Sequence, residues 1–213
     1  MAHAGKFWDR IAKRYARSPV ADEAAYRHKL QVTQDYLEPE MELLEIGCGT
    51  GSTAITHAPF VHHTRAVDIS EKMLAFARDK ATAANVRNVR FEQAAIDELE
   101  LPDAGYDVVL ALSILHLVED RDAVIARLHQ ALRPGGFFIS STACLGDKMG
   151  FFKFIAPLGH ALGLLPVLRV FTSQDLQDSL TRAGFEINYR WQTAPGKALF
   201  IVAGKAGPGR AGS

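Results

Sequence analysis

The sequence predicts an α/β fold in which a largely parallel sheet is flanked by helices. The middle of the chain alternates short β-branched runs with amphipathic stretches, the pattern of strands joined by crossover helices. These runs are apolar and end at small or polar residues, as strands buried on both faces do. Near the end of the chain, two further runs are separated only by residues 193–197, which predicts an antiparallel hairpin.

Seven segments are predicted to be strands. The five in the alternating part of the chain are Glu42–Gly47, Thr64–Ile69, Asn88–Ala94, Tyr106–Ser113 and Gly136–Thr142. The two in the hairpin are Phe185–Gln192 and Ala198–Gly204. The hairpin makes the expected sheet mixed rather than fully parallel.

Three helices are predicted from their end signals. One begins after Ser70, a second runs from about Asp120 to Leu132, and a third begins at Thr172. Thr172 with Asp175 forms a variant of the capping box, and Gly184 is a candidate C-terminal stop. The residues expected on the buried faces are, helix by helix, Met73, Leu74, Ala77 and Ala81; Val124, Leu128 and Leu132; and Leu176, Leu180 and Ala183.

Two regions outside this alternation are candidate covers over a binding site. Residues 6–38 contain roughly two helices, in which Phe7, Ile11 and Tyr15 stand at helical spacing and predict one buried face. Residues 145–171 form an apolar insertion after the fifth strand. Residues 206–213 are Gly-rich and predict a flexible tail, so we expect residues 1–205 to form a single domain.

Composition excludes several classes of protein. Lys+Arg and Asp+Glu both number 24 in the 213 residues, and this zero formal charge disfavours a large phosphate-binding surface and hence nucleic acid as a partner. Cys48 and Cys144 are the only cysteines, too few for a disulfide framework, and the N-terminal residues lack the apolar core of a signal peptide. These features predict a reducing, cytoplasmic location.

The strongest chemical signal is an apolar strand that runs into three alternating glycines and then into a helix. The segment reads Leu-Leu-Glu-Ile-Gly-Cys-Gly-Thr-Gly over residues 43–51. Glycine tolerates positive φ and has no Cβ, so the loop can pass close to a ligand while the helix N-terminus offers free N–H groups. Asp68 ends the second strand, where an acidic residue accepts hydrogen bonds from the two hydroxyls of a ribose in nucleotide-binding α/β folds.

Other nucleotide sites fit this loop less well. The dinucleotide fingerprint is Gly-x-Gly-x-x-Gly, and counted from Gly47 the chain has Ser52 at the last glycine position, which disfavours NAD. A P-loop needs Gly-Lys-Ser/Thr, and no lysine lies near Gly51, which disfavours ATP hydrolysis. A tight turn without a ligand is the remaining alternative, although it would not require three glycines.

Four successive motifs resemble those of the class I S-adenosylmethionine-dependent methyltransferases that act on small molecules. Within that class, they are similar to the families called methyltransferase domain 11 and methyltransferase domain 25. They are Glu-Ile-Gly-Cys-Gly-Thr-Gly at 45–51, Ala-Val-Asp-Ile-Ser at 66–70, the Leu-Pro-Asp-x-x-Tyr-Asp-Val-Val run at 101–109 and Leu-Arg-Pro-Gly-Gly at 132–136. The resemblance spans residues 40–142 and implies a Rossmann-like sheet of seven strands with the last one antiparallel. It also implies S-adenosyl-L-methionine as the cofactor.

The resemblance assigns cofactor contacts to particular residues. Glu45 would approach the amino-acid end, Asp68 would hold the ribose, and Leu112 would lie near the methionine part. Where many relatives carry Asp, this chain has Ala95, so a polar contact to the adenine amino group would have to come from Asp97. The full set of expected cofactor-binding residues is Glu45, Gly47, Gly49, Gly51, Asp68, Ile69, Met73, Ala95, Ile96 and Leu112.

The methyl acceptor in this family lies near the end of the fourth strand. His116 is the only titratable side chain in residues 110–117, so it is the candidate general base, with a structural role as the alternative. The apolar insertion predicts a hydrophobic lid and a lipophilic small-molecule acceptor, and its charged residues and prolines disfavour a transmembrane span. A core-completing hairpin or a homodimer contact is the other interpretation of this insertion.

The sequence therefore predicts an enzyme that transfers a methyl group from S-adenosylmethionine to a small, lipophilic molecule by in-line displacement. The alternative is a non-catalytic protein of the same fold that binds S-adenosylmethionine or its demethylated product. No metal site is predicted, because the adjacent His62 and His63 would point different ways and neither cysteine has a partner at ligand spacing. Trp8 and Tyr15 are candidates for closing the site.

Overall fold

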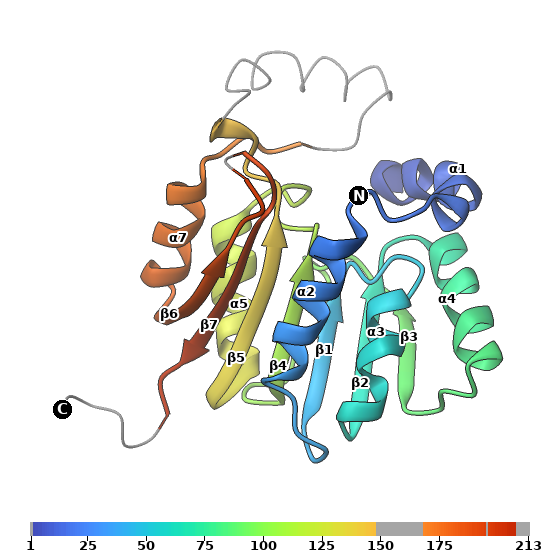
Figure 1. Ribbon diagram of the computed structural model, residues 1–213, viewed down its shortest axis with the longest axis horizontal. Coiled ribbons are helices and arrows are strands. Elements are labelled where there is room, and N and C mark those ends of the chain that lie inside the picture. The colour runs from blue at the N-terminus through green and yellow to red at the C-terminus, as the bar shows by residue number, and fades with distance from the viewer. Residues whose placement is uncertain (1, 148–167, 195, 208–213) are drawn as a thin grey trace. The chain divides into compact units, whose positions relative to one another are not determined.

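A computed structural model of the chain describes residues 2–147, 168–194 and 196–207 (Figure 1). Its strands are β1 (Glu42–Ile46), β2 (His63–Asp68), β3 (Val89–Gln93), β4 (Tyr106–Leu112), β5 (Leu132–Thr142), β6 (Phe185–Trp191) and β7 (Leu199–Lys205). They form one seven-stranded mixed sheet in the order β3-β2-β1-β4-β5-β7-β6. This confirms the predicted fold class. Internal contacts divide the chain into two units, Met1–Leu99 and Glu100–Ser213.

The first unit contains three parallel strands and their helices. β2 pairs with β1 on one side, with Glu45 opposite Ala66, and with β3 on the other, with Asp68 opposite Gln93. Leu43 and Leu44 of β1 are neighbours in sequence, and both are fully buried. A strand that buries successive side chains is covered on both faces, as a parallel strand between helical layers must be. The helices are α1 (Ala2–Arg17), α2 (Glu23–Gln34), α3 (Ser52–His57), the 3₁₀ helix η1 (Ala58–Phe60) and α4 (Glu71–Ala83).

Helix α4 follows its sequence signals closely. The Ser70 hydroxyl accepts a hydrogen bond from the Met73 N–H at 3.2 Å, as an N-cap side chain does. The four residues predicted for its apolar face are all buried, namely Met73, Leu74, Ala77 and Ala81. The α4 prediction is therefore confirmed.

The second unit contains the other four strands, with α5 (Arg121–Ala131), the 3₁₀ helix η2 (Leu145–Asp147) and α7 (Ser173–Arg182). β4 and β5 are parallel, whereas β7 is antiparallel to both β5 and β6, so the predicted hairpin is confirmed. β5 begins at Leu132 rather than at Gly136. Leu132 pairs with Tyr106, and the register between β4 and β5 then shifts before Val108. The Arg-Pro-Gly-Gly sequence at 133–136 predicted the end of the preceding helix, so this early part of β5 was not expected.

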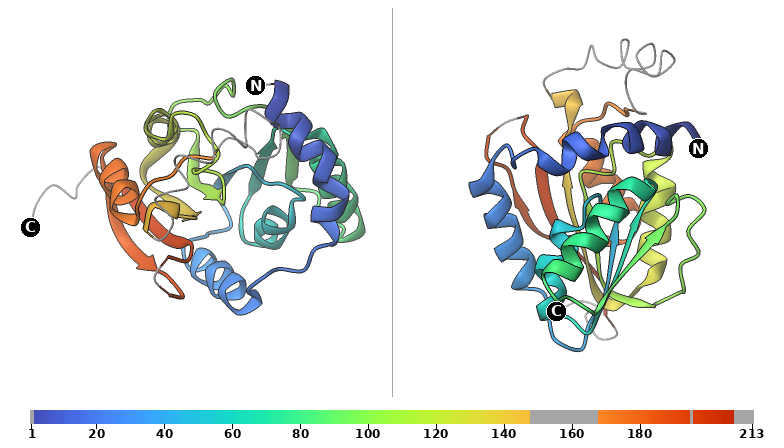
Figure 2. Two further views of the ribbon diagram at one scale, coloured as in Figure 1. Left: turned by 90° about the horizontal axis from the view of Figure 1, so that it is seen from above. Right: turned by 90° about the vertical axis from the view of Figure 1, so that its right-hand side faces the viewer.

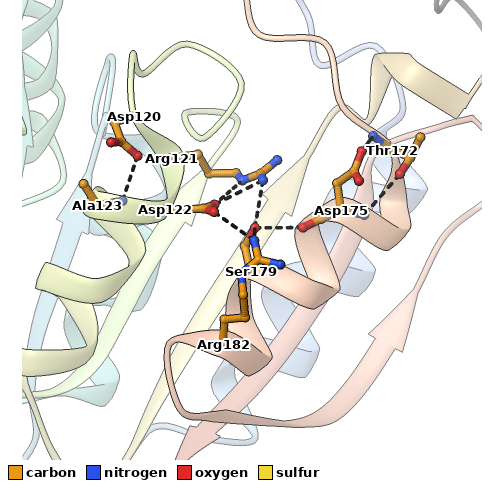
Figure 3. A network of polar contacts seen from close by, with 8 residues as sticks. All are labelled: Asp120, Arg121, Asp122, Ala123, Thr172, Asp175, Ser179 and Arg182. Carbon is orange, nitrogen blue, oxygen red and sulfur yellow. Dashed lines mark hydrogen bonds and ion pairs between the residues drawn. The ribbon is translucent and has the colours of Figure 1, made fainter.

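A polar network joins α5 to α7 (Figure 3). The Arg121 guanidinium donates to the Ser179 hydroxyl at 2.8 Å, and that of Arg182 donates to Asp122 at 2.8 Å. At the start of α7, the Thr172 hydroxyl accepts from the Asp175 N–H while the Asp175 carboxylate accepts from the Thr172 N–H, which completes the predicted capping box. The Arg121–Ser179 and Arg182–Asp122 contacts thus join two helices that lie far apart in the sequence.

The flanks of the predicted 145–171 insertion are joined to each other. The Gly146 N–H donates to the Phe171 carbonyl at 2.9 Å, and the Ser173 N–H donates to the Asp147 carboxylate at 3.0 Å. Residues 148–167 of the insertion and 208–213 of the predicted tail lie outside the described residues. Among the described helices, none combines the length and apolar character needed to cross a bilayer.

Candidate cofactor-binding site

The glycine loop begins directly after β1, and each of its three glycines has a positive φ. The values are 65° at Gly47, 54° at Gly49 and 73° at Gly51, a conformation that other residues rarely adopt. The Cys48 N–H donates to the Val67 carbonyl at 3.0 Å, which fastens the loop to β2. The loop conformation therefore depends on glycine at all three positions.

Two of these glycines face different surroundings. A Cβ placed on Gly49 would have only one neighbour within 4 Å, the Tyr15 ring at 3.9 Å. A Cβ on Gly51 would lie 2.7 Å from the Ala77 Cβ and 2.9 Å from the Phe91 ring. Gly49 thus leaves room above the loop, whereas Gly51 allows α3 to start close to α4 and β3. The sequence resemblance had grouped both as cofactor-facing.

Asp68 holds the loop from the end of β2. Its Oδ2 accepts from the Gly49 N–H at 2.8 Å and its Oδ1 accepts from the Ser70 N–H at 2.9 Å. Burial raises the pKa of the Asp68 carboxyl, and these backbone donors partly offset that effect. Each carboxylate oxygen has a further lone pair, so Asp68 can accept hydrogen bonds from a diol while it positions Gly49.

Glu45 lies beneath the loop in β1 and is only 3% exposed. Its carboxyl accepts from the Ala54 N–H of α3, and among the described residues its Oε2 has no hydrogen-bond partner. Burial, and then the nearby Asp68 carboxylate, raise the pKa of Glu45 to about 8. An unsatisfied buried oxygen of this kind requires an explanation, and a ligand N–H group is one.

Four residues predicted to contact the adenine, Ile69, Met73, Ala95 and Ile96, also belong to the first unit. The Met73 side chain is 2% exposed and Ala95 is 8% exposed, so both are largely covered. Ile69 and Ile96 are partly buried, and a Cβ on Gly5 of α1 would lie 3.2 Å from the Ile69 carbonyl oxygen. The close approach of α1 at Gly5 therefore covers Ile69. Asp97 is exposed.

Helix α1 lies past the carboxyl ends of the first unit's strands, beside the start of α4 (Figures 1 and 2). The Asp9 carboxylate accepts from the Ser70 hydroxyl at 2.6 Å and from the Lys72 N–H at 3.1 Å. Tyr15 packs edge-on against Trp8 and is 51% exposed, so the predicted buried face of Phe7, Ile11 and Tyr15 is wrong. Partial burial and the Asp68 carboxylate raise the pKa of Tyr15. Tyr15 therefore faces the glycine loop.

The two remaining predicted residues belong to the second unit. Leu112 ends β4 and is partly buried, and Ser113, the next residue, has a φ of 59° that is unusual for a non-glycine residue. The His116 carbonyl accepts from the Arg169 N–H at 2.8 Å, and within the described part of the chain the His116 Nδ1 has no hydrogen-bond partner. Burial lowers the pKa of His116, so the ring is neutral and a proton acceptor near pH 7.

Three polar residues near the loop were not assigned a role from the sequence. Asp9, Tyr26 and Thr53 each contact another part of the first unit through a side chain. No local pattern marks them, because their partners lie far away in the sequence. Their proximity to the loop is seen only in the three-dimensional contacts between residues distant in sequence.

Comparison with known proteins relates the central part of the chain to a family of methyltransferase domains. Residues 43–136 match a family model described as a methyltransferase domain. Within this range, the chain is similar to methyltransferase domains. The solved structure of an S-adenosylmethionine-dependent methyltransferase from Mesorhizobium loti matches with a TM-score of 0.67 and 23% identity, covering 83% of this chain and 95% of that one.

Curated relatives of the chain include two enzymes with named activities. The chain is 46% identical over 96 residues to the 27-O-demethylrifamycin SV methyltransferase of Amycolatopsis mediterranei, covering 44% of this chain and 35% of that enzyme. It is 30% identical over 126 residues to the ubiquinone biosynthesis O-methyltransferase of Acinetobacter baumannii, covering 59% of this chain and 53% of that enzyme. The matched part therefore spans about a third to a half of these relatives.

The residues of the first unit fit S-adenosylmethionine, the cofactor expected from the sequence. The space above Gly49 admits a ligand beside the backbone, and the unpartnered Glu45 Oε2 suits an ammonium group. The Asp68 carboxylate retains the capacity to accept hydrogen bonds from ribose hydroxyls.

Proposed function

We propose that the protein is a methyltransferase that uses S-adenosylmethionine to methylate a hydroxyl group of a small, lipophilic molecule. The observation that carries this proposal is the arrangement of Gly49, Asp68 and Glu45, which combines room above a glycine loop with a diol acceptor and an unsatisfied buried carboxyl oxygen. The hydroxyl acceptor is supported by the two O-methyltransferases among the relatives. A cytoplasmic location and a homodimer remain predictions.

In the proposed mechanism, the cofactor supplies a methyl group already activated by a sulfonium. The main task of the protein is then to hold the acceptor oxygen in line with that methyl carbon and to keep water out. Glu45 and Asp68 would orient the two ends of the cofactor, and Leu112 would pack against its methionine part. Bound S-adenosylmethionine would supply the methyl carbon to the acceptor oxygen and keep the electrons of the broken carbon–sulfur bond, and His116 would accept the proton of the acceptor hydroxyl.

The proposed lipophilic acceptor rests on the apolar insertion. The described flanks of this insertion lie in the second unit together with His116, and the Arg169 N–H of one flank donates to the His116 carbonyl. The apolar composition of the insertion favours an acceptor with apolar substituents.

The proposal is tested by calorimetric titration with S-adenosylmethionine, its demethylated product S-adenosylhomocysteine, and NAD. We expect micromolar binding of the two sulfur ligands and none of NAD. Asp68→Ala should weaken both sulfur ligands by about tenfold or more, because charge-assisted hydrogen bonds to the ribose are lost. Asp79→Ala, at an exposed aspartate of α4, is the matched control. Tight NAD binding, or wild-type affinity in Asp68→Ala, would refute the cofactor assignment.

Methyl transfer is tested next with labelled cofactor and a panel of quinols and hydroxylated polyketides. Incorporation of label into an acceptor hydroxyl supports the proposed reaction. Binding of S-adenosylmethionine with no transfer to any hydroxylated compound would count against O-methylation.

A further inference from the structure

Tyr26 of α2 extends toward the first turn of α3, directly after the glycine loop. Its hydroxyl lies 3.2 Å from the Thr53 hydroxyl, and either atom can be the donor. Both side chains are partly buried, so they are neither core residues nor freely solvated. A pair of hydroxyls in this position still has hydrogen-bonding capacity for a ligand.

This hydroxyl pair is close to Glu45. Ala54, the residue after Thr53, donates its N–H to the Glu45 carboxyl, so the same turn of α3 contacts both Tyr26 and Glu45. Burial raises the pKa of the Tyr26 phenol, the Thr53 hydrogen bond opposes this, and Glu45 and Tyr15 raise it further. The Tyr26 phenol therefore lies within electrostatic range of Glu45 and Tyr15.

The chemistry of this cluster selects a particular kind of ligand group. Glu45 and Asp68 contribute carboxyls, while Tyr15, Tyr26 and Thr53 contribute hydroxyls. A feature independent of the Tyr26–Thr53 hydroxyl pair also indicates a ligand here. The Glu45 Oε2 is buried and has no hydrogen-bond partner among the described residues. A primary ammonium has three N–H donors and a positive charge, so it satisfies this oxygen and is favoured by the carboxyls. The Tyr26 hydroxyl can donate to a neighbouring carboxylate of the same ligand.

We propose that Tyr26, oriented by Thr53, is a specificity-determining residue that binds the amino-acid end of the cofactor beside Glu45. The proposal rests on S-adenosylmethionine being the cofactor and adds to it a residue from α2. In this arrangement, Tyr26 makes the affinity for the cofactor depend on its amino-acid end as well as on its adenosine. Thr53 acts through Tyr26 and is a positioning residue.

The test compares two ligands that differ in the amino-acid end. S-adenosylhomocysteine carries this end, whereas 5′-methylthioadenosine has the same adenosine and a thioether but lacks it. Tyr26→Phe should weaken S-adenosylhomocysteine about three- to tenfold, the usual effect of one lost hydrogen bond, and leave 5′-methylthioadenosine within about twofold of the wild type. Thr53→Val should give the same selective loss with a smaller magnitude. Tyr36→Phe is the matched control.

The outcomes separate this inference from the function on which it rests. Wild-type protein that binds neither ligand would overturn the proposed cofactor itself. Where the wild type binds both, an equal loss of the two ligands in Tyr26→Phe assigns Tyr26 a structural role and overturns the inference. Unchanged affinity for S-adenosylhomocysteine in Tyr26→Phe overturns it as well.

Discussion

Glu45 combines full burial, one unsatisfied oxygen and a neighbouring carboxylate, an arrangement that disfavours its charged form in the free protein. Its backbone partner, the Ala54 N–H, opposes this effect only in part. Glu45 is therefore a residue at which ligand binding and stability conflict, as residues of functional sites often are.

Glu45→Gln should make the free protein more stable at alkaline pH. Because the folded-state pKa is raised to about 8, the stabilising contribution of protonated Glu45 is complete below the unfolded value near 4.5 and is lost as pH rises through 8. Glutamine has no charge to bury, so its advantage over the wild type should grow between pH 5 and pH 8.5. We expect a melting temperature a few degrees higher at pH 8.5, measured by thermal unfolding, and weaker cofactor binding.

Glu92→Gln is the control, because it should change the stability in the opposite direction to Glu45→Gln. The Arg65 guanidinium donates to Glu92 at 2.9 Å and lowers its pKa, so this substitution removes a stabilising charge. It should lower stability at every pH at which Glu92 is ionised. A gain for Glu45→Gln that did not change with pH would contradict the account given for Glu45.

His116→Ala tests the base at the residue scale. If the ring accepts the hydroxyl proton, kcat should fall by about 10²-fold or more, with little change in cofactor affinity. Burial lowers the pKa of His116, so the wild-type rate should hold at neutral pH and decline only as the ring is protonated below pH 6.5. Rate profiles across pH check this, with exposed His62 replaced by Ala as the control. A loss below tenfold at all pH values would make His116 structural.

At the scale of elements, Asp9 joins α1 to the start of α4. The Asp9 carboxylate accepts hydrogen bonds from the Ser70 hydroxyl and the Lys72 N–H at the start of α4, where a negative charge also interacts favourably with the helix dipole. A single 16-residue helix has marginal stability on its own, so its order depends on such docking. Because Tyr15 of the same helix faces Gly49, we expect this docking to affect cofactor exchange.

Asp9→Ala should release α1 and speed loss of the cofactor product. Amide hydrogen exchange of residues 5–17 should rise, and the dissociation rate of S-adenosylhomocysteine should increase by about tenfold, since the Ser70 hydroxyl and Lys72 N–H lose their acceptor. Lys13→Ala, at an exposed position of the same helix, should leave both measurements unchanged. Unaltered exchange in α1 of Asp9→Ala would show that the packing at Gly5 suffices to hold the helix.

At the scale of the whole molecule, stability at low pH should depend on His57. This α3 residue is fully buried, and neither ring nitrogen has a partner among the residues that the structure describes. Burial lowers its pKa to about 4, whereas the unfolded chain protonates near 6.5. The unfolded state therefore binds a proton that the folded state does not, and stability falls as pH drops from 6.5 to 4.

His57→Leu should remove this part of the acid sensitivity. Leucine cannot be protonated and leaves no buried polar atom unsatisfied, so the variant should match or exceed the wild type at pH 7 and lose less stability at pH 5. Urea unfolding at the two pH values measures the difference. His62→Leu, at an exposed histidine, should retain the full acid sensitivity. Equal pH dependence of His57→Leu and the wild type would assign the acid loss to other groups.

The sequence by itself determined the strands, the helix caps and the glycine loop, because these signals are local. The Ser70 cap, the Thr172–Asp175 capping box and the hairpin each involve residues close together in the chain, and each is present as predicted. The position of Asp68 at the end of the second strand was also predicted, and there its carboxylate accepts from the Gly49 N–H. Boundaries shifted where a signal was ambiguous, as at the start of β5.

Only the tertiary structure decided which residues complete the candidate site. Tyr26 and Thr53 are 27 positions apart and Asp9 and Ser70 are 61 apart, so no periodicity or cap could pair them. The same holds for Gly49 and Gly51, which look alike in sequence but differ in what a side chain would meet. Contacts of this kind depend on how helices pack against the sheet, and packing is a property of the folded chain rather than of any short segment.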